Sequence, residues 1–249
     1  MKPSHIIHGI LAVSVICVLL LAPGCTKDND DNDNPPNPVP CSGMPTITYM
    51  GQTYNTIQIG DQCWMKENLN VGNMINSSED QADNNIIEKY CYDNDEANCD
   101  EFGGLYQWDE VMQYVMTPGT QGICPDGWHI PVDDEWKLLE GMTDSKYGVG
   151  DATWDAFWYR GHDAGTHLKT TTGWCCSGDG TDKYGYSAMP GGFYSPDSLK
   201  YLDQGWGAFF WLSTDAFNDA WTRTLTEPST VYSGTKKRAN GFSVRCLRD

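Results

Sequence analysis

The residues best suited to metal chemistry lie in the segment DNDEANCD, residues 93–100. A second, shorter acidic turn contains Asp179 and Asp182. Calcium takes roughly six to eight oxygen ligands, so both segments are candidate calcium sites. The spacing differs from that of an EF-hand, and the alternative is a pair of solvated acidic loops, the first closed by a disulfide. The candidate ligands of the first segment are Asp93, Asp95, Glu96, Asn98 and Asp100.

Aromatic side chains are the second group with binding chemistry. The chain has 10 Trp and 13 Tyr, and the segment TWDAFWYRGHD, residues 153–163, shows no clean amphipathic stripe. An aromatic ring beside polar groups can dock the apolar CH face of a sugar while its hydroxyls form hydrogen bonds. The alternative is that most of these rings form the core. The candidate sugar-binding residues are Trp154, Trp158, Tyr159 and Trp206, whereas the Trp residues within regular motifs are assigned to the core: Trp64, Trp108, Trp128, Trp136, Trp211 and Trp221.

The sequence predicts no catalytic residue. The only histidines after residue 8 are His129, His162 and His167, and neither a GxSxG elbow nor an HExxH pair occurs. Asp133 and Glu135 could be read as paired carboxylates for glycoside cleavage. They fall in the expected first turn of a helix, however, where compensation of the helix dipole explains them. Whether the protein is an enzyme stays open, and the residues favour a binding function.

The cysteines indicate an oxidising compartment. Eight of the ten follow residue 40, and an even number in an exported chain favours disulfides. Short spacing predicts the pairs Cys91–Cys99 and Cys41–Cys63, which would each close a local loop. The adjacent Cys175 and Cys176 are unusual, because a vicinal disulfide would strain its peptide, and the two could equally pair with separate partners.

The N-terminus of this 249-residue chain reads as a lipoprotein leader. Lys2 precedes an apolar segment, residues 6–22, and Ala22-Pro23-Gly24-Cys25 resembles a lipobox. We therefore expect a signal peptide over residues 1–24, lipidation of Cys25, an acidic proline-rich tether over residues 25–40 and a globular domain over residues 41–249. The alternative is an ordinary secretory signal cleaved nearby. The segment TKDNDD, residues 26–31, resembles the export signal of some surface lipoproteins, in which a lysine is followed by acidic residues. This resemblance predicts a place on the outer face of the outer membrane.

The net charge of the chain limits the classes of molecule that it is expected to bind. The formal net charge is −18, with 34 acidic against 16 basic residues. Such a chain repels nucleic acid and anionic membrane, so the predicted membrane contact is the lipid anchor alone. Cations and neutral molecules such as polysaccharides, or another surface protein, are the expected partners.

Periodicity predicts short strands around two helices. Alternating apolar residues predict a hairpin over residues 47–59 and a strand over 62–66. Helical spacing predicts one helix over residues 105–115 and a second after Pro131, with Gly141 as its C-cap. Further strands are expected at residues 208–212, 221–225, 231–232 and 242–246.

Several motifs in a fixed order resemble the Fibrobacter succinogenes major paralogous domain. They are YNTIQIGDQCWMKENLNVG (54–72), YCYDNDEANCDEFGGLYQWDEVMQY (90–114), GICPDGWHIPVDDEWKLLEGM (122–142), GTDKYGYSAMPGGFY (180–194), FFWLSTD (209–215), AWTRTL (220–225) and GFSVRCLRD (241–249). The resemblance implies a domain of secreted and surface lipoproteins with no established chemistry. Members more often have threonine at the position of Val132, so here the second helix should lack a side-chain cap.

Two of these motifs, WHIPVDDEW and GFSVRC, are also similar to the formylglycine-generating enzyme and C-type lectin group. That similarity implies an α+β, C-type-lectin-like fold with short antiparallel strands, two helices and long disulfide-tied loops, in which the last strand returns beside the first. It also implies a Cys124–Cys246 disulfide.

The sequence thus predicts a surface lipoprotein that acts as a non-catalytic adhesion or glycan-binding module. The alternatives are a structural or protein-binding lipoprotein and, third, an oxidase similar to the formylglycine-generating enzyme. Cys175 and Cys176 do not align with the active cysteine pair of that enzyme, so the residues give no support to the third alternative.

Overall fold

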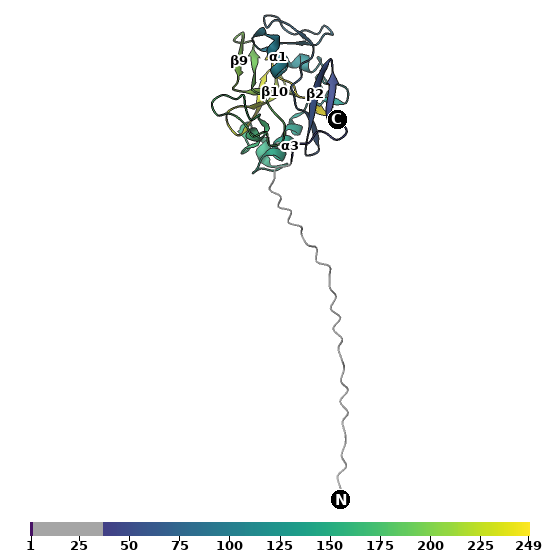
Figure 1. Ribbon diagram of the computed structural model, residues 1–249, viewed down its shortest axis with the longest axis vertical. Coiled ribbons are helices and arrows are strands. Elements are labelled where there is room, and N and C mark those ends of the chain that lie inside the picture. Colours follow the sequence, from purple (N-terminus) through teal and green to yellow (C-terminus); the bar gives the residue numbers. More distant parts are fainter. Residues whose placement is uncertain (2–36) are drawn as a thin grey trace. The chain divides into compact units, whose positions relative to one another are not determined.

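A computed structural model describes Met1 and residues 37–249 (Figure 1). The expected signal peptide, Cys25 and most of the expected tether lie outside the described residues. The end of that tether belongs to the domain: Val39 forms an antiparallel bridge with Gln58, and the Gln58 amide donates to the Val39 carbonyl at 2.9 Å. The folded unit therefore begins before Cys41.

One sheet gathers strands from the two ends of the domain. Met50 and Gly51 both have positive φ, as the tight turn of a hairpin requires, and the predicted hairpin and third strand are confirmed. The C-terminal strand pairs with the third strand, not with the first. In order across this five-stranded sheet the strands are β1 (Thr46–Tyr49), β2 (Gln52–Ile59), β3 (Gln62–Met65), β13 (Leu247–Arg248) and β6 (Trp128–His129).

A second sheet forms the larger half of the domain. The strands predicted at residues 208–212, 221–225 and 231–232 are confirmed, each as part of a longer strand. A separate two-stranded sheet pairs β4 (Asn73–Met74) with β5 (Glu88–Lys89). In order across the six-stranded sheet the strands are β7 (Trp158–Arg160), β12 (Val231–Lys237), β11 (Asp219–Leu225), β10 (Ala208–Ala216), β8 (Gly191–Ser195) and β9 (Lys200–Gln204).

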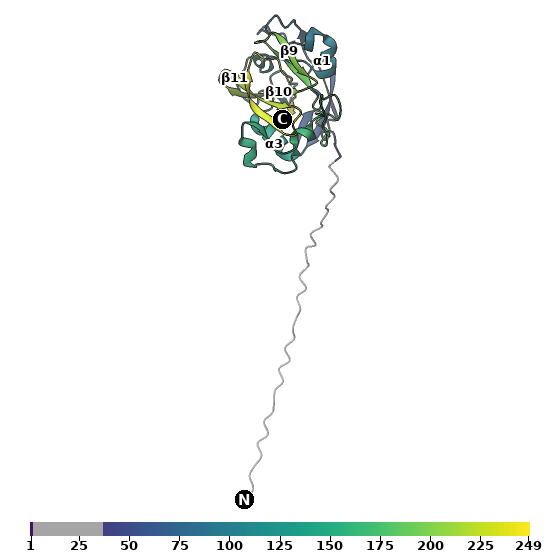
Figure 2. The ribbon, with the colours of Figure 1, turned by 90° about the vertical axis from the view of Figure 1, so that its left-hand side faces the viewer.

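Helices make up only about 16% of the described residues. The expected α+β, C-type-lectin-like fold with two helices is therefore wrong: the domain is mostly β, with four α-helices that are short and peripheral to the sheets. Figures 1 and 2 place α1 and α3 at opposite ends of it. Across the described part of the chain, no helix has the length and apolar character needed to cross a bilayer. The helical segments are η1 (Tyr92–Asn94), α1 (Glu96–Phe102), α2 (Trp108–Val111), α3 (Asp133–Thr143), η2 (Ala152–Asp155) and α4 (Ala164–Leu168).

The helix expected over residues 105–115 is much shorter than its pattern suggests. The Val111 carbonyl, which would accept the fourth amide along the helix, instead accepts the Ile123 amide at 2.9 Å. Gln113 and Tyr114 then take positive φ, so α2 cannot continue. A tertiary hydrogen bond thus overrides helical periodicity.

The second helix, α3, is confirmed after Pro131. Val132 lacks a side-chain acceptor, as expected, and Thr214 Oγ1 of β10 accepts the Asp133 amide at 3.0 Å instead. Gly141 is not the C-cap: α3 continues to Thr143, and a Cβ at Gly141 would lie 2.7 Å from Val149 Cα. This glycine permits close approach of a loop to the helix.

The expected strand over residues 242–246 is an irregular segment that threads between the sheets. Phe242 bridges to Tyr106, and Ser243 bridges to Phe210. The Val244 carbonyl then accepts the Leu69 amide at 2.9 Å. Because successive residues pair with different segments, no continuous ladder forms, and the segment instead links the two halves of the core.

Three disulfides join the predicted pairs. The bonds are Cys41–Cys63, Cys91–Cys99 and Cys124–Cys246. The third spans 122 residues and ties the loop before β6 to the segment before β13. Closing so long a loop restricts the unfolded chain most strongly of the three, by roughly 4–5 kcal/mol in the chain-entropy model.

A buried carboxylate joins α3 to the six-stranded sheet. Glu140 is fully buried, and both of its oxygens accept from Arg160 of β7, at 2.8 and 2.9 Å. Arg223 of β11 donates to the same carboxylate at 2.5 Å and also to Asp133 at 2.5 Å. Two arginines therefore satisfy one buried carboxylate from two strands.

We expect Glu140→Gln to destabilise the domain by about 3–5 kcal/mol, because it leaves two buried guanidinium groups without their shared partner. Urea unfolding of the variant measures this loss. Lys237→Gln breaks an exposed ion pair with Asp197 and should cost less than about 1 kcal/mol. Equal losses in the two variants would show that the Glu140 network has no special role.

Candidate functional site

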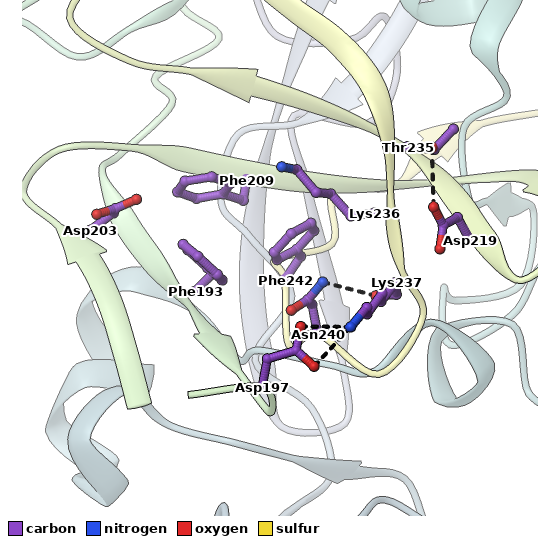
Figure 3. Close-up of a pocket in the computed structure, with 10 residues that line it drawn as sticks. All are labelled: Phe193, Asp197, Asp203, Phe209, Asp219, Thr235, Lys236, Lys237, Asn240 and Phe242. Atoms are coloured by element: carbon purple, nitrogen blue, oxygen red, sulfur yellow. Dashed lines mark hydrogen bonds and ion pairs between the residues drawn. The ribbon is translucent and has the colours of Figure 1, made fainter. Parts of the chain in front are cut away.

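One pocket of the domain has an aromatic floor. It holds about 410 Å³ and lies where β8 and β9 face the ends of β11 and β12 (Figure 3). Phe193 contributes one ring of the floor, with its centroid 4.6 Å from that of Phe209 and 5.5 Å from that of Phe242. Phe209 and Phe242 are buried in the core, so the floor is rigidly supported. An apolar surface of this size suits a small organic ring or one unit of a longer chain.

Polar groups of both charges surround that floor. Lys237 Nζ donates to both Asp197 oxygens, at 2.7 and 2.9 Å, and Asn240 Nδ2 donates to the Lys237 carbonyl at 3.0 Å. Asp203 and Lys236 line the same pocket and form no ion pair within residues 37–249. Such donors and acceptors match the alternating hydroxyls of a sugar better than they match a purely apolar ligand.

Backbone register joins the pocket floor to rings at the edge of the sheet. Phe209 pairs with Thr224, Thr224 with Tyr232, and Tyr232 with Tyr159. Residues directly opposite on neighbouring strands share one face, so these side chains form a row that spans roughly 14 Å over four strands. Thr224 is buried, and the exposed Lys236 connects the pocket to Tyr232, with Nζ 5.6 Å from the ring centroid.

Three sheet-edge rings lie at the end of this row: Tyr159 and Tyr232 belong to it, and Trp158, which pairs with Ser233, contacts Tyr232 through its ring. Trp158 is 68% exposed and Tyr159 52% exposed. Both contact Tyr232 edge to face, at centroid distances of 5.9 and 5.4 Å. Partial burial raises the pKa of Tyr232, so its hydroxyl stays protonated and able to donate. The edge of the sheet thus presents an aromatic surface with polar tips.

The backbone of Trp158 is strained. Its φ is 72°, in the left-handed region that a bulky side chain rarely takes. The next residue but one, Arg160, is held by Glu140 and by the carbonyls of Trp154 and Ala156, which fixes β7 despite the strain.

The other two predicted sugar-binding residues lie elsewhere. Trp154 is only 1% exposed, and its indole nitrogen donates to the Gly148 carbonyl at 2.8 Å, so it belongs to the core. Trp206 is 51% exposed in the turn between β9 and β10, where its amide donates to the Asp203 carbonyl. The structure therefore brings together only Trp158 and Tyr159 of the four.

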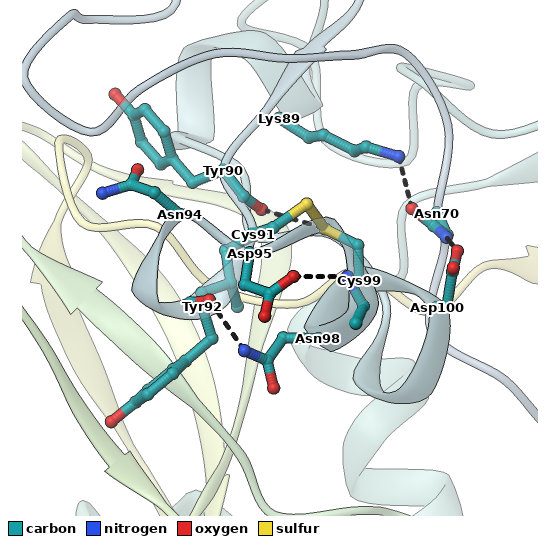
Figure 4. Close-up of a disulfide and its surroundings, with 12 residues drawn as sticks. Asn70, Lys89, Tyr90, Cys91, Tyr92, Asn94, Asp95, Asn98, Cys99 and Asp100 are labelled. Carbon is teal, nitrogen blue, oxygen red and sulfur yellow. Dashed lines mark hydrogen bonds between the residues drawn. A yellow bond between two sulfur atoms is a disulfide. The ribbon is translucent and has the colours of Figure 1, made fainter.

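The predicted calcium ligands of the acidic segment make separate contacts in different directions. Asp95 caps α1 by accepting the Ala97 amide, and Asp100 accepts from Asn70 at 3.4 Å on another side (Figure 4). Asn98 donates a hydrogen bond to the Tyr92 carbonyl and accepts one from Gln204. Asp93 and Glu96 are exposed. Nowhere in residues 37–249 do three or more His, Cys, Asp or Glu side chains gather as metal ligands.

The second acidic turn also serves local structure. Asp179 accepts the Trp174 amide at 3.0 Å, and Asp182 accepts both the amide and the hydroxyl of Ser187 at 2.7 Å. These carboxylates organise their own loops, so the geometry gives the predicted calcium ligands no common centre.

The sequence patterns did not predict the pocket. Phe193, Asp203, Lys236 and Phe242 come from four separate segments, and only the tertiary fold brings them together. The one local signal was the exposed Lys236-Lys237 pair at the end of a strand in an otherwise acidic chain.

His129 is hydrogen-bonded to two carboxylates from different elements. Its Nδ1 lies 2.7 Å from Asp249 Oδ1, and its Nε2 lies 2.9 Å from Glu135 Oε1, which joins β6, α3 and the segment after β13. Burial opposes protonation of the ring, but the hydrogen bonds to the two carboxylates outweigh it and raise the pKa of His129. The protonated form is therefore the one that stabilises the fold.

We expect the stability gap between the wild type and His129→Gln to depend on pH. Because the folded-state pKa is raised above the unfolded value of about 6.5, the contribution is fully present below that value and is lost as pH rises through the folded-state pKa. Urea midpoints at several pH values from 5 to about 9 measure the gap. Asp249→Asn should reduce the pH dependence, and a gap that widens with pH would contradict the assignment.

Strain at Trp158 predicts an unusual order of stability. Trp158→Gly should be more stable than Trp158→Ala by about 1 kcal/mol, because glycine takes positive φ without steric cost. Tyr159 does not have a positive φ, so Tyr159→Gly should be less stable than Tyr159→Ala. Thermal or urea unfolding of the four variants tests both orders, and the same order at both positions would exclude strain.

Comparison with known proteins identifies the family. No curated protein and no solved structure shows significant similarity to the chain. The family model described as the Fibrobacter succinogenes major domain matches residues 57–248, which include the whole six-stranded sheet and the pocket but leave out β1 and the first part of β2. The further similarity to the lectin and formylglycine-generating enzyme group is not shown. The chain belongs to the Fibrobacter succinogenes major domain family.

Proposed function

We propose that the protein is a non-catalytic module that binds an extended saccharide. The observation that carries the proposal is the row that leads from the polar-rimmed phenylalanine pocket to the sheet-edge rings. One sugar unit stacks over Phe193 with its hydroxyls toward Asp203, Lys236 and Asn240, and a later unit stacks on Trp158 or Tyr159. A saccharide chain is long enough to contact both places at once.

A lipid on Cys25 holds this module on the outer face of the outer membrane, in our proposal. The motif Ala22-Pro23-Gly24-Cys25 and the acidic residues after it support this location. A neutral or cationic polysaccharide is the suitable partner, since the net charge of −18 disfavours polyanions.

The proposal predicts selective loss of sugar binding in ring variants. A glycan array on the compact unit, residues 35–249, identifies a ligand whose affinity calorimetry then measures. Phe193→Leu preserves an apolar floor but removes the ring, and Trp158→Ala removes the exposed ring. Each should weaken binding roughly tenfold or more. Asp203→Asn should weaken it as well, by removing a charged acceptor.

Phe217→Ala provides the matched control. This ring is 85% exposed and lines neither the pocket nor the row, so its loss should leave affinity unchanged. A calcium chelator should also leave affinity unchanged, since the acidic loops share no centre. If the protein binds no glycan on the array, the saccharide proposal fails, and a protein-binding role takes its place. Equal losses in Phe217→Ala and Trp158→Ala would also contradict it.

A further inference from the structure

Cys175 and Cys176 lie in a surface turn with their sulfur atoms together. The two Sγ atoms are 2.7 Å apart, and neither cysteine forms a disulfide within residues 37–249. Cys176 is exposed and Cys175 is partly exposed. The two side chains therefore meet without any rearrangement of the backbone, and solutes can reach them.

The turn is anchored on both sides of the cysteine pair. The Cys175 amide donates to the Gly205 carbonyl at 2.7 Å, and the Gly178 amide donates to the Cys175 carbonyl at 2.9 Å. Before the pair, the buried Trp174 donates its amide to Asp179 and its indole nitrogen to Thr170 Oγ1. Cys176 and Ser177 have φ of 58° and 68°, which folds the chain tightly at the pair. These contacts hold the two thiols side by side.

The other six cysteines within residues 37–249 all form disulfides. A chain that matures with three disulfides is exposed to an oxidant, and the accessible pair at 175–176 meets the same oxidant. No third cysteine in this part of the chain is left to compete for either sulfur.

We propose that Cys175 and Cys176 form a redox-active dithiol–disulfide couple that exchanges with small thiols and disulfides. Neighbouring Cα atoms are about 3.8 Å apart across a trans peptide, less than the roughly 4.4–6.8 Å that ordinary disulfides span. The bond between the two is consequently strained and reduced more readily than the other three disulfides.

The exchange reaction balances with a small-molecule disulfide as oxidant. The Cys176 thiolate, on the more exposed residue, attacks one sulfur of the oxidant, forms a mixed disulfide and releases one thiolate. Cys175 stays protonated during this step, because its hydrogen bond with Cys176 raises its pKa. Cys175 then loses its proton to solvent, attacks Cys176 Sγ and releases the second thiolate. The protein loses two electrons and two protons, and one disulfide becomes two thiols; two equivalents of thiol reverse the sequence.

The chain offers a direct assay, because tryptic cleavage after Lys169 and Lys183 gives a peptide, residues 170–183, with these two cysteines and no others. The protein is incubated with oxidised glutathione, alkylated and digested. We expect the peptide to be unalkylated and lighter by two hydrogens than the dithiol form. In buffers of increasing reduced glutathione, the peptide should become alkylated at a reductant concentration at least tenfold below that needed for Cys124 and Cys246.

The variants Cys175→Ser and Cys176→Ser are matched controls. Each should leave a single thiol that takes one glutathione and forms no internal bond, with the other three disulfides intact. Two alkylated cysteines after oxidation would overturn the proposal. So would a peptide cross-linked to another cysteine, or reduction at the same concentration as the Cys124–Cys246 bond. The assay involves no saccharide, so its outcome is separate from that of the binding proposal.

Discussion

The buried Glu140 carboxylate is the constraint around which the domain is arranged. A carboxylate removed from water is costly unless its hydrogen bonds are complete, and Arg160 and Arg223 complete them from two different strands. This requirement sets the position of α3 against β7 and β11. It also holds β7 firmly enough for Trp158, two residues before Arg160, to keep its strained backbone.

The pocket depends on the same core through its floor. Phe242 belongs to the irregular segment between the sheets, where Cys246 is tied to Cys124, and its ring packs 4.4 Å from that of Trp211. Two of the three floor rings are therefore core residues, and Phe193 is partly buried against them. The polar residues of the rim, in contrast, lie outside the core cluster.

The acidic residues show how local roles can imitate a binding site. Asp95 caps a helix, Asp179 and Asp182 each organise a turn, and Asp133 pairs with the buried Arg223. Burial alone would raise the pKa of Asp133, but Arg223 and Lys137 lower it, which marks a structural ion pair rather than a proton donor. In each case the carboxylate is hydrogen-bonded or ion-paired within its own loop or network, and these contacts account for its position.

Local patterns in the sequence determined the elements whose interactions are local. The hairpin at Met50-Gly51, the start of α3 after Pro131, the short-range disulfides and the family motifs were all predicted, because turn residues, alternation and spacing act over a few positions. Tertiary contacts decided the rest. Ile123 captures the Val111 carbonyl and ends α2, successive partners break up residues 242–246, and the mostly β architecture follows from long-range pairing that periodicity does not encode. The burial of Trp154, the exposure of Trp158 and the pocket lined by five strands of one sheet were likewise decided only when the sheets packed, since the environment of a side chain depends on which surfaces meet.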